Sequence, residues 1–162
     1  MTSATSSAMK GQPATQLTVR REISATPEEL FDAFLDAESL GEFMRYGSET
    51  NSDVITDVRV GGKFEINLHV NGVVIPHRGE YRELDRPRKL VFTWISKNTN
   101  NEESVVTIQF HNVAGSKPRT EVVLTQVMLP EYQIKGHIGG WTRIVELLDE
   151  IYGRPAAPAD RR

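Results

Sequence analysis

The segment KGHIGGWTRIVELL, near the C-terminus of the chain, brings a histidine and a tryptophan together within a predicted helix. On a helical wheel His137 falls inside the apolar arc, close to Trp141. An imidazole in such a place is a polar anchor in mostly apolar surroundings, which is the usual composition of a small-molecule pocket. A histidine at the edge of a core, bonded to a nearby backbone or side-chain group, would have the same spacing, so both interpretations stay open.

The same segment contains three glycines, although each glycine inside a helix costs about 1 kcal/mol relative to alanine. Gly136 and Gly140 fall on one flank of the apolar arc, whereas Gly139 falls toward the polar side. Because glycine has no side chain, the flank positions let a strand or a ligand come close to the helix backbone. We therefore expect either close helix–sheet packing or a ligand at Gly136 and Gly140, and the wheel offers no packing reason for Gly139.

Aromatic and branched apolar residues at strand and helix spacing supply the walls that a pocket would need. Trp94 and Trp141 lie on elements expected to face each other, and Tyr81 adds a hydroxyl that could orient a ligand. The same side chains would equally form an ordinary core. The predicted ligand-binding set is Phe43, Phe64, Ile66, Leu68, Tyr81, Phe92, Trp94, His137, Trp141 and Val145.

No familiar catalytic motif is present. There is no Gly-x-Ser-x-Gly, Walker A or dinucleotide-binding sequence, and no helix follows the paired glycines 61–62, which are read as a turn. His69 and His77 flank a predicted hairpin turn, but a convincing metal site needs a third ligand, so we expect neither a metal nor a cofactor. His137 with Tyr81 is the one acid–base pair that an enzyme would use. No catalytic residue is assigned, and catalysis stays open.

Composition limits the classes of function. The 162-residue chain is 38% hydrophobic and 25% charged, with a formal net charge of -3. A basic excess is missing, which argues against nucleic-acid binding. There are no cysteines and no apolar run long enough to cross a bilayer, so we expect a cytoplasmic protein without membrane insertion.

The chain length fits one domain with tails. Residues 1–16 are rich in Ser, Thr, Ala, Gly and Pro and are expected to be a flexible arm. Residues 153–162 follow a helix-ending glycine with prolines and small residues and are expected to be a flexible tail. The folded domain is expected over residues 17–152.

Hydrophobic periodicity predicts one strand, two helices, six strands and a long helix, in that order. Thr26 before Pro27 and two glutamates is typical of a helix start, and Asn71 with Gly72 is the strongest hairpin signal. The expected strands lie near 17–23, 54–60, 63–70, 73–84, 89–96, 104–111 and 120–129, and the helices near 27–35, 38–44 and 130–152.

These elements favour an α+β fold. Strands joined by short turns pair antiparallel, and the apolar face of such a sheet must be covered. The last helix, about 30 Å long at 1.5 Å per residue, can cross the whole sheet. Its apolar stripe is Ile134, Ile138, Trp141, Val145, Leu148 and Tyr152. We expect a curved antiparallel sheet of about seven strands around this helix, with two short helices after the first strand.

The order and spacing of five segments resemble the START-like (SRPBCC) helix-grip superfamily, and within it the group related to the activator of the ninety-kilodalton heat-shock chaperone's ATPase. The segments are VRREISATPEELFDAFLD, DVRVGGKFEI, GEYRELDRPRKLVFTW, TEVVLTQ and HIGGWTRIVELL. They cover nearly the whole predicted domain. Many members carry a tryptophan after the second short helix, where this chain has Phe43, Met44 and Tyr46 instead.

The resemblance implies a cavity between the sheet and the C-terminal helix, which in other members holds lipids, sterols, polyketide intermediates or plant hormones. We expect a binding module for a small hydrophobic molecule of lipid, polyketide or aromatic type. One alternative is a regulator of a heat-shock chaperone ATPase that acts through protein contact, and another is a small cyclase or dehydratase. The charged segment RGEYRELDRPRK is either a solvated face or a docking surface, and the oligomeric state stays open.

Overall fold

The structure is a computed structural model that describes residues 15–45 and 50–155. Most of the expected N-terminal arm and C-terminal tail, together with Tyr46, lies outside these residues. The described part of the chain forms one sheet of seven strands in the order β1-β7-β6-β5-β4-β3-β2. The strands are β1 (Leu17–Ile23), β2 (Asp53–Thr56), β3 (Lys63–Val70), β4 (Val73–Asp85), β5 (Lys89–Trp94), β6 (Ser104–Asn112) and β7 (Thr120–Val127).

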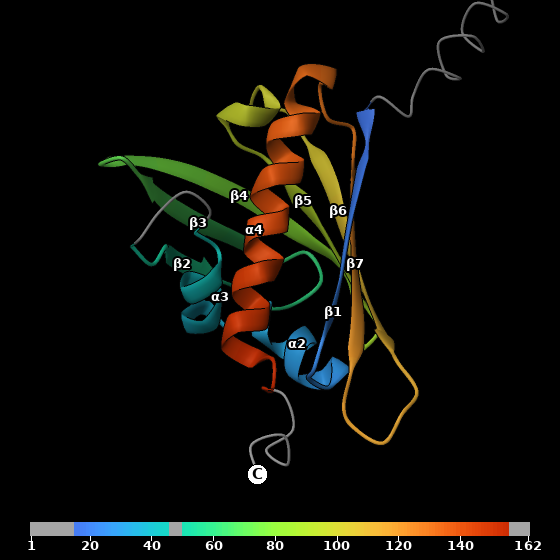
Figure 1. The fold of residues 1–162 in the computed structure, drawn as a ribbon. Coiled ribbons are helices and arrows are strands. Elements are labelled where there is room, and N and C mark those ends of the chain that lie inside the picture. The colour runs from blue at the N-terminus through green and yellow to red at the C-terminus, as the bar shows by residue number, and fades with distance from the viewer. Residues whose placement is uncertain (1–14, 46–49, 156–162) are drawn as a thin grey trace, which may run out of the picture.

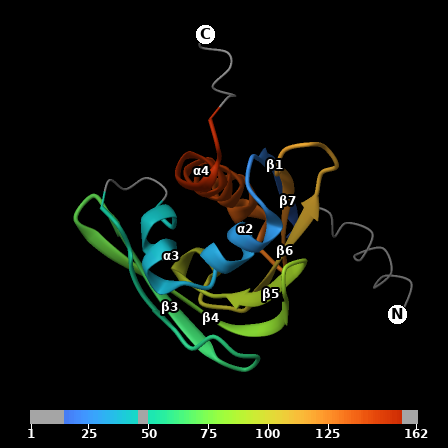
Figure 2. The same ribbon diagram turned by 90° about the horizontal axis from the view of Figure 1, so that it is seen from below.

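All the strand pairs are antiparallel, and the helices lie on the concave side of the sheet. The long helix α4 (Ile134–Tyr152) follows a short 3-10 turn, η3 (Glu131–Gln133), and runs along the sheet, with α2 (Pro27–Ala33) and α3 (Ala37–Phe43) beside it (Figures 1 and 2). The expected α+β arrangement of a curved sheet around the C-terminal helix is confirmed.

Local sequence signals account for the ends of several elements. The Thr26 hydroxyl accepts a hydrogen bond from the backbone N–H of Glu29, and the Glu29 carboxylate accepts one from the backbone N–H of Thr26. This capping box starts α2 as the sequence indicates. Asn71 and Gly72 adopt φ angles of 52° and 77°, so the predicted hairpin between β3 and β4 is confirmed.

Two features of β4 favour a bend in the sheet. Gly79 lies opposite Phe64 of β3, and a Cβ atom there would stand 1.9 Å from the carbonyl oxygen of Thr93 and 2.4 Å from the Phe64 ring. Only glycine permits this approach. The register between β4 and β5 also shifts between Tyr81 and Glu83, and such an irregularity bends a sheet. The sheet can therefore wrap around α4.

Two expectations about element faces and bounds are corrected. The strand expected near residues 54–60 is β2, which ends at Thr56, and Val58 and Val60 are 46% and 62% exposed in the turn that follows. Ile138 was expected in the buried stripe of α4 but is 40% exposed, whereas Ile144 and Leu147 are buried. Ile138 is the exception in the predicted stripe, because Trp141, Val145 and Leu148 are buried and Ile134 and Tyr152 pack against the core.

A buried chain of hydrogen bonds attaches α4 to the sheet. The indole Nε1–H of Trp141 donates to Oε1 of Gln126 in β7 at 2.7 Å, and Nε2–H of Gln126 donates to Oγ of Ser104 in β6 at 2.9 Å. The Ser104 hydroxyl donates to the backbone carbonyl of Trp94 in β5 at 2.7 Å. We call these four residues the Gln126 network. The side chains of Gln126 and Ser104 are fully buried. Each hydrogen bond therefore satisfies a polar group that water cannot reach.

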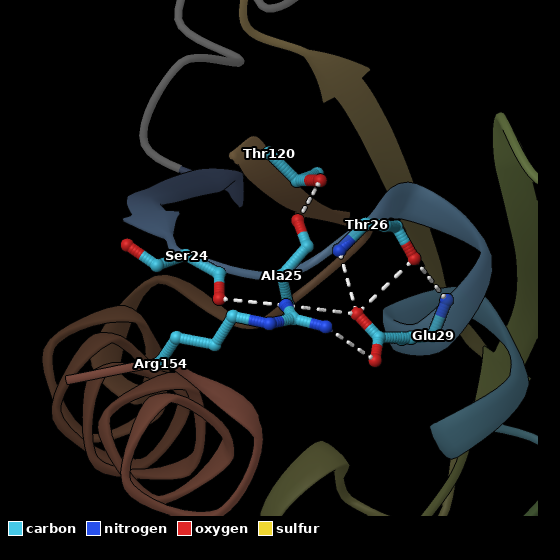
Figure 3. A network of polar contacts seen from close by, with 6 residues as sticks. All are labelled: Ser24, Ala25, Thr26, Glu29, Thr120 and Arg154. Atoms are coloured by element: carbon cyan, nitrogen blue, oxygen red, sulfur yellow. Dashed lines mark hydrogen bonds and ion pairs between the residues drawn. The ribbon is translucent and has the colours of Figure 1, made fainter. Parts of the chain in front are cut away.

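A second polar network fixes the C-terminal end of α4 (Figure 3). Arg154 lies just after the helix, and its guanidinium donates to both oxygens of the Glu29 carboxylate and to the carbonyl of Ser24. The pKa of the Glu29 carboxyl is lowered. The largest cause is its hydrogen bond to the Thr26 backbone, and the hydrogen bond from Arg154 comes next. The α2 start and the α4 end are therefore held by one carboxylate.

The Gln126 network makes a testable prediction about stability. Replacing Gln126 with Met leaves the Trp141 indole N–H buried without an acceptor, so we expect the free energy of unfolding to fall by about 1–3 kcal/mol in urea denaturation. Trp141→Phe removes the donor and some volume and should cost at least as much. The double variant should lose clearly less than the sum, because the shared hydrogen bond is lost only once. Additive losses would contradict the network.

Candidate functional site

A pocket of about 200 Å³ lies at the N-terminal end of α4. It is bounded by the first turns of the helix, the end of β5 and the loop that carries η2 (Lys97–Thr99). The hydroxyl of Tyr132 donates to Oδ1 of Asn100 at 2.7 Å and so joins this loop to η3. We call this site the His137 pocket. Its lining residues are Trp94, Asn98, Gln133, Gly136, His137, Gly140, Trp141 and Ile144.

Two indole rings form the apolar wall of the His137 pocket. The ring centroids of Trp94 and Trp141 lie 4.9 Å apart at an interplanar angle of 52°, and each residue is 2% exposed. The N–H of Trp141 is used by Gln126. This indole therefore offers a guest its ring surface and no hydrogen bond. The pair belongs to the core and to the pocket wall at once.

His137 is the titratable residue of the pocket lining. Its Nδ1 lies 2.9 Å from the backbone carbonyl oxygen of Gln133, one helical turn earlier. The bond is the backbone contact expected of a histidine at a core edge, but the ring also faces the pocket. Burial lowers the pKa of His137, and the bond to Gln133 opposes that shift only in part. The imidazole is therefore neutral at pH 7.

Two of the three glycines of α4 lie at the pocket. A Cβ atom at Gly136 or at Gly139 would meet nothing within 4 Å. Close helix–sheet packing therefore gives no reason for glycine at Gly136, and that interpretation is wrong there. Gly136 and Gly140 line the pocket, whereas Gly139 does not. The structure provides no account of Gly139.

The interior between the two short helices and the middle of the sheet is closely filled. Phe64, Ile66, Tyr81 and Phe92 surround a remnant of about 10 Å³ together with Trp94, which holds at most one water molecule. Phe43, Leu68 and Val145 are buried in the core and line neither the His137 pocket nor this remnant. Of the ten predicted ligand-binding residues, Trp94, His137 and Trp141 come together at the His137 pocket.

Tyr81 and His137, the acid–base pair considered for an enzyme, line different cavities. Burial raises the pKa of Tyr81 to about 12, and the nearby charge of Asp57 adds to the shift. A tyrosine with this pKa keeps its proton at neutral pH. The structure therefore gives the cyclase or dehydratase interpretation no shared site.

The two histidines beside the hairpin turn do not meet. His69 pairs with Val74 and His77 pairs with Ile66, which places the two side chains on opposite faces of the sheet. His69 Nε2 lies 2.8 Å from the carboxylate of Asp53. Within residues 15–45 and 50–155, no cluster of three or more His, Asp or Glu side chains is arranged to hold a metal ion.

The charged segment 78–89 lies at the surface and is largely paired within the chain. Arg82 lies 3.1 Å from Glu103, Arg86 lies 2.8 Å from Asp32, and Arg88 lies 3.1 Å from Asp85. Such exposed pairs add little to stability, because water and salt screen them. Their geometry is that of a solvated face with compensated charge.

Sequence reasoning missed the polar part of the pocket. Asn98 in η2 and Gln133 in η3 supply amide groups, and Ile144 supplies an apolar contact from α4. Nothing in the sequence singles out Asn98 within the polar loop KNTNNEE. Gln126 carried a signal, because a glutamine at an inward position of an apolar strand is unusual.

Beneath the pocket wall, His77 makes a testable prediction about pH. It is 1% exposed, its ring lies 5.0 Å from the Trp94 ring, and burial lowers its pKa to about 4 despite a hydrogen bond to the Ile75 carbonyl. Below the ordinary histidine pKa of about 6.5, His77 is protonated in the unfolded chain, but in the folded chain it stays neutral down to about pH 4. The free energy of unfolding therefore decreases as the pH is lowered, by about 2 kcal/mol between pH 7 and pH 5 from His77 alone.

The measurement compares urea unfolding of wild type and His77→Phe at pH 7 and pH 5. Phenylalanine keeps a ring beside Trp94 but cannot be protonated, so the variant should lose about 2 kcal/mol less than wild type on acidification. The carboxylates and His137 are common to both proteins and cancel in the difference. Equal losses in the two proteins would show that His77 is not buried as a neutral ring.

Known proteins share this fold. Residues 24–153 match the family described as Activator of Hsp90 ATPase homolog 1-like protein. No curated protein matches the chain. In the described part of the chain, no helix is both long and apolar enough to cross a membrane.

Several solved structures resemble the chain over most of its length. Protein CV1439 from Chromobacterium violaceum is 21% identical with a TM-score of 0.70, and the match covers 87% of this chain and 99% of that one. PFC0360w, an HSP90 activator from Plasmodium falciparum, is 27% identical with a TM-score of 0.66, over 85% of this chain and 95% of that one. CalU16 from Micromonospora echinospora is 18% identical with a TM-score of 0.60, over 91% and 79%. The chain therefore belongs to the Activator of Hsp90 ATPase homolog 1-like family and has the START-like helix-grip fold.

Proposed function

We propose that the chain is a binding module whose guest is a small, partly aromatic molecule held in the His137 pocket. The observation that carries the proposal is Gly136, a helical glycine that faces the pocket beside Trp141 and has open space where a side chain would stand. Glycine costs the helix about 1 kcal/mol, and packing does not require it. Room for a guest would account for glycine at this position.

The dimensions of the site favour a compact guest over a long acyl chain. The pocket measures about 200 Å³, and an apolar cavity of roughly 150 Å³ holds benzene in another protein. One or two fused rings would therefore fill it. The interior beyond Trp94 offers about 10 Å³, which leaves no room for a lipid tail. Of the lipid, polyketide and aromatic guests considered, the aromatic class fits best.

The binding energy would come mainly from the guest's own apolar surface, because the two indoles are each only 2% exposed and have little area left to bury. Apolar area removed from water contributes about 25 cal/mol per Å². The amides of Asn98 and Gln133 and the ring of His137 would fix the orientation of the guest. Because the guest would bind only the folded chain, it would also raise the unfolding temperature as its concentration rises.

The test uses a matched pair of glycine substitutions. A library of one- and two-ring aromatic compounds is screened by the NMR signals of the two tryptophan indoles, and hits are titrated against Gly136→Leu and Gly139→Leu. Both leucines enter open space on α4, so both variants should be at least as stable as wild type. Gly136→Leu should weaken binding by more than about tenfold because its side chain fills the pocket, and Gly139→Leu should bind as wild type does.

Two outcomes would contradict this proposal. One is that no compound in the library shifts the indole signals of Trp94 and Trp141. The other is that hits bind Gly136→Leu as tightly as they bind Gly139→Leu, because the guest would then lie elsewhere.

A second candidate function is regulation of a heat-shock chaperone ATPase through protein contact. It is supported by the family match and by 27% identity to the Plasmodium falciparum HSP90 activator over 95% of that chain. The ATPase rate of the chaperone from the same organism would be measured with and without this protein. We expect a rise that Gly136→Leu retains, since the contact would lie outside the pocket. No stimulation at a stoichiometric excess would remove this candidate.

A further inference from the structure

The structure also points to the chemical class of the guest. Resting on the proposed function of the pocket, we propose that it selects a neutral aromatic molecule that carries a hydrogen-bond donor, a phenolic hydroxyl or a ring N–H, and that this donor bonds to Nε2 of His137. The position of the imidazole proton decides whether Nε2 accepts or donates a hydrogen bond.

A backbone carbonyl fixes the tautomer of His137. The carbonyl oxygen of Gln133 can only accept a hydrogen bond, so Nδ1 of His137, at 2.9 Å, must be the protonated nitrogen. In the neutral ring, Nε2 is then unprotonated and can only accept. The helix itself therefore holds the ring in one tautomer before any guest arrives.

Nε2 of His137 has no hydrogen-bond partner among the described residues. No side-chain nitrogen or oxygen among them is buried without a partner. It follows that Nε2 is open to solvent, and His137 is part of the pocket lining. A guest that covers this nitrogen without donating to it would leave a buried acceptor unpaired, which weakens binding.

The remaining lining argues against a charged guest. The lining includes no lysine, arginine, aspartate or glutamate, so a carboxylate or an ammonium would lose water without gaining a partner of opposite charge. Burial lowers the pKa of His137, so its ring does not supply a positive charge at pH 7. The N–H of Trp141 is bonded to Gln126, so that indole offers only the surface of its ring, whereas the indole N–H of Trp94 has no hydrogen-bond partner among the described residues. A flat, neutral molecule matches these features, and the donor is required by Nε2 of His137.

The first experiment compares two probes of nearly equal shape. We would titrate the full chain at pH 7.5 with 2-naphthol and with 2-methoxynaphthalene, which has a methyl ether in place of the donor. We expect 2-naphthol to bind wild type about tenfold more tightly, and the preference to fall below about twofold in His137→Phe. Gly139→Leu is the control variant and should keep the full preference.

The second experiment reads the tautomer directly and needs no variant. Two-bond ¹H–¹⁵N correlation spectra of wild type distinguish a protonated ring nitrogen from a bare one. We expect Nδ1 of His137 to carry the proton, and Nε2 to show the signal of a bare nitrogen that shifts when 2-naphthol is added. A proton on Nε2, with Nδ1 bare, would overturn the inference whatever the probes do.

The outcomes separate this inference from the proposed function. If both probes bind equally and move the Trp141 signal, the preference for a hydrogen-bond donor is wrong, while small-molecule binding at the pocket stands. If neither naphthalene binds but other library compounds do, the preference for a hydrogen-bond donor is overturned and the proposed binding function is not. If nothing binds at the pocket, the inference falls together with the function on which it rests.

Discussion

The hydrogen bond from Trp141 to Gln126 fixes one point of the C-terminal helix on the sheet. An amide buried as completely as that of Gln126 costs about 1–3 kcal/mol if it is left unpaired, so the helix must bring a donor to this one point. Ser104 takes the other side of the amide and passes the constraint to the backbone of β5. Apolar packing alone would allow α4 to slide or rotate, because it has no direction. The Gln126 network removes that freedom.

The pocket is a consequence of this placement. With Trp141 fixed, the C-terminal half of α4 buries its apolar face, and its first turns lie over the end of β5 and the η2 loop. A large side chain at Gly136 would fill the space there. The chain has glycine instead, and it sets one imidazole and two amides around the indole rings. Fold does not determine function in this superfamily, so the argument for a guest rests on these residues and not on the family.

Much of the fold could be predicted from the sequence, because its signals are local. The capping box at Thr26, the Asn71-Gly72 turn and the alternation along each strand act within a few residues. The hairpin register also follows from the two-residue turn, and counting outward from it would have shown His69 and His77 on opposite faces. The Gln126 network could not be predicted, since it joins residues brought together only by the pairing of β5, β6 and β7. The exposure of Ile138 and the filled interior depend on helix tilt and summed side-chain volumes, which no pattern in one segment contains.

The central claim is that a buried indole N–H holds α4 in place and so shapes the pocket. Hydrogen exchange of the Trp141 indole proton, followed by NMR, tests it most directly. If the network exists as described, this proton exchanges only when the helix leaves the sheet, so its protection should approach that of the slowest backbone amides of β6 and β7. An indole proton of Trp141 that exchanges as fast as one freely exposed to water would contradict the account.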